Sequence, residues 1–399
     1  MPSHGRAAGA DPRQRRTGGA VSATDDVLLD VQDLTKRFGI RGRRRGEVTA
    51  VSGVSLQVRA GQTLGIVGES GCGKTTTARM MIRLLDPTSG SVHFAGRDIT
   101  SLSSRAMRPL RRDLQMVFQD PFSALNPRRT VGSSIAAPFQ IAGVTPPGGT
   151  RQAVGELLER VGLAAADQGR YPHEFSGGQR QRIGIARAIA LRPKLIVCDE
   201  PVSALDVSVQ AQVLNLLAEL QDETGVGYVL VAHDLAVVRH LSHRVAVMYL
   251  GRVVEVADRD ALYDSPLHPY THALLSAVPL PADATGARRE RIRLQGDPPS
   301  PVAPPSGCVF RTRCWKAQDR CRDEVPALDE LRPDHLVACH FPEESTAAGR
   351  IIVGPAPPQD DPVLTARPVP HPLEVISEVA PMGTAEPSGA EFVDPRDAD

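Results

Sequence analysis

The 399-residue chain has no long hydrophobic run, no excess of charge of either sign and only 4% aromatic residues. No stretch approaches the roughly 18 apolar residues that a membrane-spanning helix needs, so we expect a local surface to make any membrane contact. Arg15 and Arg16 lead into TGGAVSATDD rather than the apolar segment of a secretion signal, which favours a cytoplasmic location. The 46 basic residues balance the 46 acidic ones, so no global field indicates nucleic acid as a partner.

Disulfides are not expected in a reducing compartment, so clustered cysteines need another explanation. The composition, 41% hydrophobic and 23% charged, is that of an ordinary soluble globular protein. Residues 27–265 alternate short apolar strands with helical stretches, whereas 266–342 are loop-rich and hold four of the six cysteines. We therefore predict two folded units, flanked by disordered segments at 1–26 and 343–399. The basic run RGRRR at 41–45 is interpreted as a solvated loop rather than a lipid or nucleic-acid contact.

The stretch TLGIVGESGCGKTTTARMMIRLL predicts a phosphate-binding loop. An apolar strand runs into Gly68, and four residues later Gly73, Lys74 and Thr75 open a helix, which is the GxxxxGK[ST] pattern in its required context. Backbone N–H groups and the helix N-terminus would bind phosphate, while Lys74 reaches the terminal phosphates and Thr75 offers a hydroxyl to Mg²⁺. The predicted nucleotide-binding residues here are Gly68, Glu69, Ser70, Gly71, Cys72, Gly73, Lys74, Thr75 and Thr76. The side chain of Cys72 is interpreted as incidental.

The stretch KLIVCDEP predicts the carboxylates that such a site requires. A strand from Leu195 to Cys198 delivers Asp199 and Glu200 at its carboxyl end, where open α/β sheets bind ligands. We expect Asp199 to hold Mg²⁺ through water and Glu200 to polarise the attacking water. The alternative, an acidic strand end that only caps a turn, has less weight because the phosphate loop demands this partner.

A second anion site is predicted in FSGGQRQRIGIARAIALR, where Ser176, Gly177 and Gly178 precede a helix-like run. Glycines permit close approach of an anion to the backbone, and its charge complements the helix dipole. One chain thus carries two candidate phosphate sites about a hundred residues apart.

Across residues 27–265 the chain resembles the ATP-binding subunits of ABC transporters. GESGCGKTT is similar to the family's Walker A loop, VFQDP to its Q-loop with Gln119, and FSGGQ to its signature. VCDEP resembles Walker B, SALD the D-loop with Asp206, and VAHD the switch-histidine motif with His233. The resemblance implies an α/β fold, an ABC-type P-loop ATPase domain with a helical subdomain, here followed by a small cysteine-containing C-terminal extension. Phe38 matches the position of an aromatic that stacks on adenine.

The resemblance also implies ATP and Mg²⁺ as cofactors and a second ABC ATPase subunit, identical or related, packed head to tail. Each ATP then lies between the Walker A loop of one subunit and the signature of the other, which explains the second anion site. The residues implied for the partner's nucleotide are Ser176, Gly177, Gly178, Gln179 and Asp206. Glu200, His233 and Gln119 are implied as catalytic, and Thr75, Gln119 and Asp199 as Mg²⁺ ligands.

The segments QMVFQDPFSALNPRRTV, PLHPYTHALLSAVP and GDPPSPVAPPSGCVF resemble the oligopeptide and dipeptide permease ATPases. This implies ATP-driven peptide uptake, with two integral membrane permease subunits, an extracytoplasmic peptide-binding protein, no nucleic acid, and a peripheral location on the cytoplasmic face of the cell membrane. A nickel or other small-solute importer is the nearer alternative. A soluble ABC ATPase acting on nucleic acid or ribosomes is less favoured, because the chain has a single phosphate loop and no sustained heptads.

Four thiols, Cys308, Cys314, Cys321 and Cys339, lie within 32 residues of a segment with too little apolar content to fold unaided. Three interpretations are open: an iron–sulfur cluster, zinc, or unliganded buried thiols. Zinc prefers tighter cysteine pairs than these, whereas a [4Fe–4S] cluster tolerates varied spacing. Resemblance to peptide-importer ATPases, in which such extensions carry a cluster in some members, favours iron, with His340 as an alternative ligand.

Overall fold

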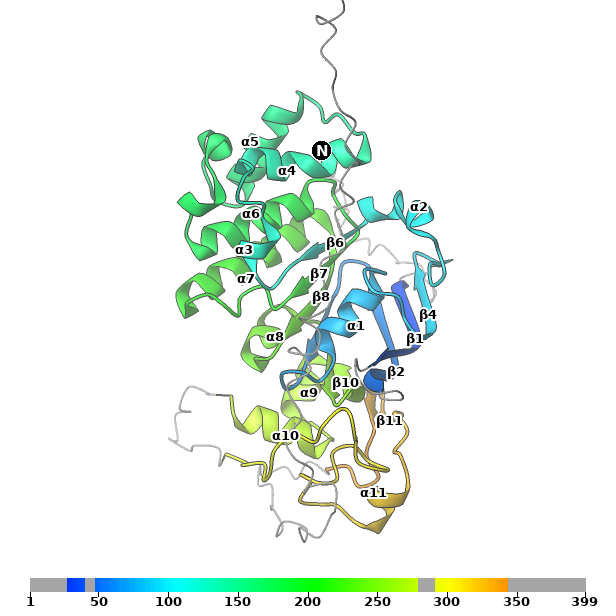
Figure 1. The fold of residues 1–399 in the computed structure, drawn as a ribbon. Coiled ribbons are helices and arrows are strands. Elements are labelled where there is room, and N and C mark those ends of the chain that lie inside the picture. The colour runs from blue at the N-terminus through cyan, green and yellow to red at the C-terminus, as the bar shows by residue number, and fades with distance from the viewer. Residues whose placement is uncertain (1–26, 40–46, 279–290, 344–399) are drawn as a thin grey trace, which may run out of the picture.

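The structure, a computed structural model, describes residues 27–39, 47–278 and 291–343 (Figure 1). The predicted disordered segment 1–26, the basic run 41–45 and residues 344–399 of the predicted tail lie outside the described residues. Glu343, the first residue of that predicted tail, is described, and its backbone N–H donates to Leu267 O at 2.7 Å. The ordered extension therefore reaches at least this residue.

The elements follow one another in chain order. The first part contains β1 (Val27–Gly39), β2 (Glu47–Arg59), β3 (Thr63–Val67), α1 (Lys74–Met81), β4 (Ser89–Phe94), β5 (Arg97–Asp98), α2 (Ser104–Met107), η1 (Leu110–Arg112), β6 (Leu114–Val117) and α3 (Pro121–Ala124). The middle part contains α4 (Val131–Ala142), α5 (Thr150–Arg160), η2 (Ala165–Gly169), η3 (Pro172–Glu174), α6 (Gly177–Ile189), β7 (Leu195–Asp199), α7 (Val207–Thr224), β8 (Gly227–Ala232) and α8 (Leu235–Leu241). The last part contains β9 (Arg244–Tyr249), β10 (Arg252–Asp258), α9 (Arg259–Asp264), α10 (Pro269–Ser276), α11 (Asp319–Asp323), β11 (Asp329–Arg332) and β12 (His335–Val337).

The main sheet has the strand order β11-β12-β10-β9-β3-β8-β7-β6. Its centre is parallel: β3 pairs with β8 and β9, and β7 pairs with β8 and β6. Every residue of β3, β7 and β8 is buried, as expected for parallel strands covered on both faces. These runs (TLGIV, LIVCD and GYVLVA) are therefore apolar almost throughout.

Successive residues of these strands point to opposite faces of the sheet and build two hydrophobic clusters. Val67 and Leu230 belong to the cluster on the side of α6 and α7. Ile66 and Val229 belong to the cluster on the side of α1 and the second sheet. Alternate residues of each strand therefore enter different halves of the hydrophobic core.

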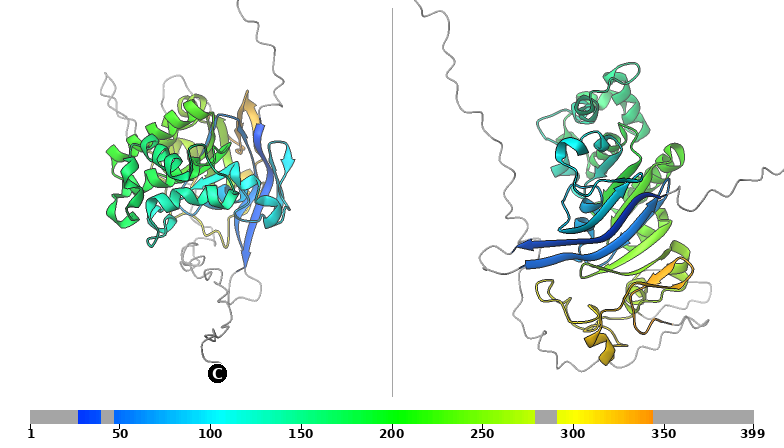
Figure 2. Two further views of the ribbon diagram at one scale, coloured as in Figure 1. Left: turned by 90° about the horizontal axis from the view of Figure 1, so that it is seen from above. Right: turned by 90° about the vertical axis from the view of Figure 1, so that its right-hand side faces the viewer.

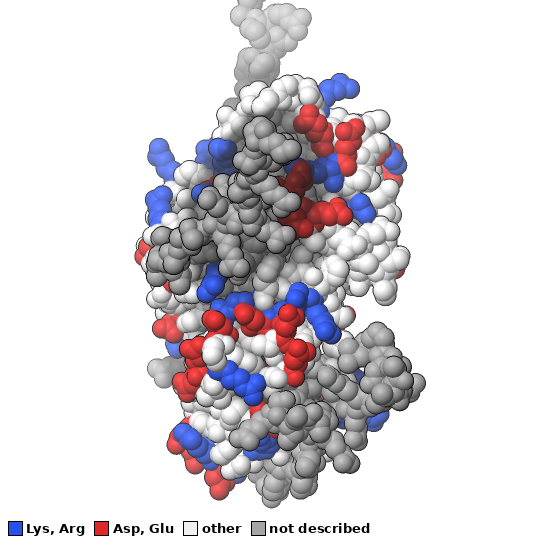
Figure 3. Space-filling view, turned by 180° about the vertical axis from the view of Figure 1, so that it is seen from behind, with Lys and Arg blue, Asp and Glu red and all other residues white. Residues whose placement is uncertain are grey.

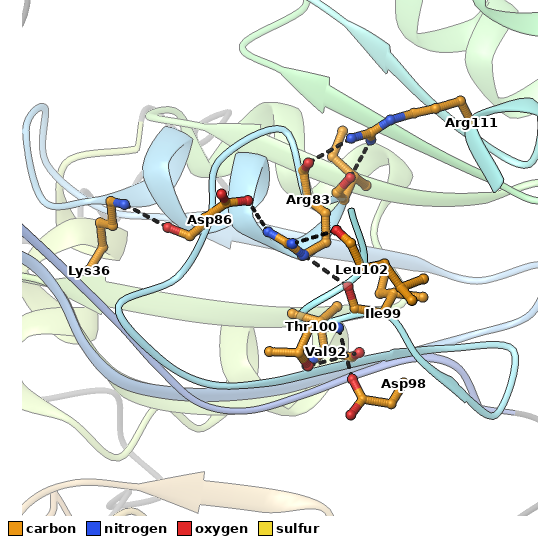
Figure 4. Close-up of polar contacts among 10 residues, drawn as sticks. Lys36, Arg83, Asp86, Val92, Asp98, Ile99, Thr100, Leu102 and Arg111 are labelled. Carbon is orange, nitrogen blue, oxygen red and sulfur yellow. Dashed lines mark hydrogen bonds and ion pairs between the residues drawn. The ribbon is translucent and has the colours of Figure 1, made fainter. Parts of the chain in front are cut away.

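The second sheet, with the order β2-β1-β4-β5, is antiparallel and joins the end of α1 through a polar network (Figure 4). Arg83, only 8% exposed, donates to Ile99 O at 2.9 Å and pairs with Asp86. Lys36 of β1 donates to Asp86 O at 2.6 Å, and Arg111 donates to Arg83 O at 2.6 Å. The segment that directly follows α1 is therefore held by groups from β1 and from the segment leading into β6.

The helical subdomain and the C-terminal extension lie at opposite ends of the molecule (Figures 1 and 2). At one end α4 and α5 pack beside α6, and at the other end lie α10, α11 and β11, the edge strand of the main sheet. The extension is continuous with the sheet, because β12 pairs with β10. Phe310, Cys314 and Cys321 lie in the same hydrophobic cluster as α6 and α7.

A buried polar group joins the extension to β10. Glu255, which has no exposed surface, accepts from Leu267 N at 2.7 Å and His268 N at 3.0 Å, and His335 Nε2 lies 2.7 Å from it. His268 is the N-cap of α10, and its Nδ1 accepts from Tyr270 N at 3.0 Å. Burial lowers the pKa of His268 to about 4, against the opposing attraction of Glu255.

We expect His268 to make the free energy of unfolding depend on pH. The folded chain keeps the His268 side chain neutral, whereas in the unfolded chain the same side chain takes up a proton at about pH 6.5. The contribution of neutral His268 to the free energy of unfolding is therefore fully present above about pH 6.5. It is lost, by about 3 kcal/mol in all, as the pH falls from there through the folded pKa of about 4.

Denaturant unfolding of the wild type and of His268→Asn between about pH 7 and about pH 4 measures this effect. Asparagine keeps an N-cap acceptor but cannot be protonated, so the variant should lack this part of the pH dependence. Curves that remain parallel for the two proteins over the whole range would contradict the prediction.

Candidate functional site

The residues predicted for the phosphate loop, the β7 carboxylates, Gln119 and His233 gather at one edge of the main sheet, because parallel strands place their carboxyl ends together. Gln119 follows β6, Asp199 ends β7 and His233 follows β8. The loop 68–73 follows β3 and leads into α1. Four segments that are distant in sequence therefore converge on one edge.

Two glycines of the phosphate loop are required by close backbone neighbours. Gly68 has φ +154°, and a Cβ there would overlap Met248 O of β9. Gly73 has φ +100°, and its Cβ would overlap Ala50 O of β2. Lys74 is 5% exposed and donates to Gly68 O at 2.8 Å, so its ammonium group lies inside the curl of the loop. Ser70 and Gly71 are exposed at its tip.

Thr75 joins this loop to the β7 carboxylate. Its hydroxyl donates to Asp199 Oδ1 at 2.8 Å. Asp199 has no exposed surface, and its burial raises the pKa of the carboxyl group, with the Thr75 hydrogen bond opposing the rise. Within the described ranges Asp199 Oδ2 has no hydrogen-bond partner, and Arg79 Nη2 lies 3.8 Å away. A hydroxyl and a buried carboxylate oxygen without a donor are ligands that suit Mg²⁺.

Glu200 lies between Gln119 and His233. Gln119 Nε2 donates to Glu200 Oε2 at 2.9 Å, and His233 Nδ1 lies 3.6 Å from the same oxygen. Glu200 has φ +44°, an uncommon backbone conformation for a residue with a side chain. Such strain persists only where the surroundings impose it, and it concentrates at functional sites. Its N–H donates to Val231 O at 2.9 Å, which fixes the turn that aims the carboxylate.

The predicted signature lies apart from this cluster. Ser176 and Gln179 form a capping box at the start of α6. A Cβ on Gly178 would overlap Val209 Cγ1 of α7, and Asp206 caps α7. In Figure 1, α6 and α1 lie on different sides of the main sheet, and in the described part of the chain no hydrogen bond joins residues 176–179 to the phosphate loop. The structure thus brings the signature together with Asp206, but not with Lys74.

Phe38 lies at the end of β1 and is half-buried. The ammonium group of Lys36 lies 5.3 Å from the centre of its ring. The ring is therefore partly exposed and already has a cation beside it.

Two residues of the extension that the sequence did not indicate contact the phosphate loop. Arg313 Nη1 lies 2.9 Å from both carboxylate oxygens of Glu69, and the N–H of Glu69 donates to the Tyr270 hydroxyl at 2.9 Å. Tyr270 lies in the segment PLHPYTHALLSAVP, to which no site role was assigned, and Arg313 lies outside the quoted motifs; they are 201 and 244 residues from Glu69. Nothing local in the sequence identifies these contacts.

All six cysteines are free thiols, and four of them belong to the extension. Cys308, Cys314 and Cys321 are buried, and Cys339 is half-buried. Burial raises the pKa of Cys314 and of Cys339 to about 12, and the charges of the other cysteines add to both shifts. Among the residues that the structure describes, no three His, Cys, Asp or Glu side chains are grouped as a metal site requires. This arrangement does not support the predicted iron–sulfur cluster.

Comparison with known proteins agrees with this geometry. Residues 51–203 match the ABC transporter family, and residues 254–321 match the oligopeptide/dipeptide transporter C-terminal region. The oligopeptide transport ATP-binding protein AppF of Bacillus subtilis is 54% identical over 326 residues, which are 80% of this chain and 99% of AppF. The chain belongs to the ABC transporter family.

Other ABC proteins show the same likeness. The di/tripeptide transport ATP-binding protein DppF of Pseudomonas aeruginosa is 49% identical over 323 residues, 80% of this chain and 99% of DppF. The ATP-binding cassette MJ0796, in a dimeric post-hydrolysis structure with ADP and Pi, is 28% identical with a TM-score of 0.53. That match covers 58% of this chain and 99% of MJ0796. The chain thus has the fold of an ABC ATPase. None of its described helices is both long and apolar enough to cross a membrane.

Proposed function

We propose that this chain is the ATP-hydrolysing subunit of an ABC importer that powers uptake of oligopeptides or dipeptides across the cytoplasmic membrane. The observation that carries the proposal is the convergence of the phosphate loop, Asp199, Glu200, Gln119 and His233 on one edge of a parallel sheet. The transporter-type C-terminal region and the peptide-transport relatives support the cargo class. A ligand-binding assay on the companion binding protein tests the cargo, which this subunit is not expected to touch.

The residues of this edge take separate roles in the proposal. Lys74 and the N–H groups of residues 68–76 bind the phosphates, while Thr75, Asp199 and Gln119 hold Mg²⁺, which neutralises phosphate charge when bound. Glu200 polarises the attacking water, and His233 senses the γ-phosphate. The ring of Phe38 stacks on adenine.

We expect Lys74→Ala and Glu200→Gln to fail in different ways. Loss of the lysine removes a charge-assisted phosphate contact, so ATP affinity should fall at least roughly tenfold. The glutamine keeps the shape of Glu200 and loses the base, so ATP should bind normally while turnover falls by roughly 10² to 10⁴. Nucleotide occupancy and phosphate release measured on both variants test the two roles. Normal turnover in Glu200→Gln would remove Glu200 from water activation.

The signature is proposed to act on the nucleotide of a second, head-to-tail ABC ATPase subunit. Ser176, Gly177, Gly178 and Gln179 begin α6, with Asp206 close by, and they lie apart from the phosphate loop of their own chain. The dimeric state of MJ0796 supports such a pairing. ATP would then hold the two subunits together, and hydrolysis would release them.

We expect Gly177→Asp to block dimer closure without weakening ATP binding to the chain's own loop. A Cβ on Gly177 meets only Leu205 Cδ2 at 3.6 Å, and an acid in the first helical turn is favourable, so the fold should tolerate the change. The new carboxylate would face the partner's γ-phosphate, and like charges there oppose closure. Gly178 is a poorer test position, because a side chain would clash with Val209 inside the same chain.

The readout is ATP-dependent crosslinking between subunits in a Glu200→Gln background, which holds the closed state. Gly177→Asp should lower dimer content roughly tenfold or more, as about 1.4 kcal/mol of repulsion suffices for that factor. Gly177→Ala is the matched control, since it adds a Cβ without charge. Equal dimer content in Gly177→Asp and Gly177→Ala would contradict the role in trans.

Two membrane permease subunits are proposed partners at the cytoplasmic face. A groove of about 560 Å³ beside the β6 end supports this, because Leu84 and Phe118 line it with 48% and 37% of their surfaces exposed. On the face drawn in Figure 3, acidic and basic side chains are interspersed, which does not favour nucleic acid as the partner. Co-purification with integral membrane proteins, as opposed to ribosomes or DNA, tests this assignment.

Cys308, Cys314, Cys321 and Cys339 are proposed to hold a [4Fe–4S] cluster as a structural centre. The support is the donor set alone: four thiols lie in one segment of the extension and three of them are buried, although the described side chains are not grouped as a metal site requires. Four thiolates are the ligands of such a cluster, so each thiol would release its proton on ligation.

We expect protein purified without oxygen to contain iron and sulfide and to show a broad brown absorption band. Both should be lost in Cys314→Ser, because one of the four ligands is removed. Cys198→Ala is the matched control, since that buried thiol lies in β7 and should leave the iron content unchanged. Stoichiometric zinc, or no metal in protein kept free of oxygen, would contradict the cluster.

A further inference from the structure

The first side chain of the phosphate loop is held by the C-terminal extension. Arg313 Nη1 contacts both carboxylate oxygens of Glu69 at 2.9 Å. The backbone N–H of Glu69 donates to the Tyr270 hydroxyl, also at 2.9 Å. Glu69 is thus fixed through its side chain and its backbone by groups outside the ATPase core.

This contact is well shielded from water. The Arg313 side chain is 8% exposed and that of Glu69 is 27% exposed, whereas both side chains of the Arg320–Glu324 pair in the same extension are more than half exposed. Salt and water screen an exposed pair strongly and a part-buried pair much less. We therefore expect the Arg313–Glu69 pair to hold its two side chains together more strongly than the Arg320–Glu324 pair does.

The anchor of Arg313 is itself rigid. Phe310 has no exposed surface, and its ring lies 5.2 Å from that of Tyr249 and 5.3 Å from that of Tyr270. Arg313 N donates to Phe310 O at 3.0 Å, so the arginine backbone is tied to this aromatic cluster. The next residue is Cys314, which places the arginine directly beside the cysteine segment.

On the loop side, Glu69 belongs to the turn that carries the phosphate-binding groups. Its carbonyl accepts from Lys74 Nζ at 2.9 Å and from Cys72 N at 3.3 Å. A displacement of the Glu69 carboxylate is therefore transmitted to Lys74 through the backbone of Glu69 alone. The path from the extension to the lysine consists of direct hydrogen bonds.

We propose that Arg313 is a positioning residue for ATP binding: through Glu69 it holds the phosphate loop in its binding conformation and couples that loop to the cysteine segment. The inference rests on the proposed ATPase function but does not depend on what the four thiols bind. Arg313 acts through Glu69 and is not expected to touch the nucleotide.

The test uses the full chain with ATP and Mg²⁺. Suppose that in Arg313→Gln the phosphate loop is in its binding conformation for about a tenth of the time. The Kd and KM for ATP should then rise roughly tenfold, because apparent affinity scales with the fraction of protein in the binding conformation. At saturating ATP the bound nucleotide orders the loop, so kcat should change less than about threefold. Arg313→Lys should restore part of the affinity, since it keeps the charge but not the planar fork.

A double-mutant cycle separates positioning from general damage. Glu69→Gln should raise Kd by a similar factor, and Glu69→Gln combined with Arg313→Gln should add little more, because both remove the same interaction. Arg320→Gln is the matched control: it breaks an arginine–glutamate pair in the same extension and should leave Kd unchanged. Thermal unfolding identifies a variant that fails to fold, in which case Arg313→Lys and Glu69→Gln complete the test.

An unchanged Kd in Arg313→Gln, or fully additive effects in the double variant, would overturn the inference. Wild-type protein that binds ATP without hydrolysing it would instead count against the proposed function, and the Kd comparison would still decide the role of Arg313. The two failures are therefore distinguishable.

Discussion

The parallel pairing of β6, β7, β8 and β3 is the constraint on which the site depends. Val117 lies opposite Cys198, Asp199 opposite Val231, and Val67 opposite Ala232. A slip of one residue in any pair would exchange the two buried faces and separate Asp199 from Thr75. The apolar side chains of β3, β7 and β8 therefore do more than fill the core. Their packing on both faces of the sheet holds the register that aligns the carboxylates with the phosphate loop.

Contacts from distant segments hold the loop between β3 and α1 and the segment that follows α1. At its start, the close approach of Met248 O requires Gly68, and Glu69 is bound by the extension. Just after α1, the carbonyls of Ile82 and Arg83 accept from Arg111, in the segment that leads into β6 and Gln119 (Figure 4). Arg111 thus joins the segment before β6 to the segment after α1.

Local patterns were enough to predict the phosphate loop and the β7 carboxylates, because strand, glycine and helix signals occur within a few residues of Lys74 and Asp199. They could not predict why Gly178 must be glycine, since its clash with Val209 arises from the packing of α6 on α7. The conformation of Glu200, with φ +44°, likewise depends on neighbouring strands. For the extension, the sequence supplied the donor types of a metal site but not their arrangement in space.

The extension shows why sequence-based domain boundaries miss function of this kind. Its strand β12 continues the main sheet, and Glu255 of β10 binds His335 and the start of α10 within the core. These contacts bring Tyr270 and Arg313 to the loop between β3 and α1. A segment with little apolar content of its own is stabilised by the ATPase core, and in return it adds two fixed contacts to Glu69. Stability of the extension and geometry of the phosphate loop are therefore properties of one structure.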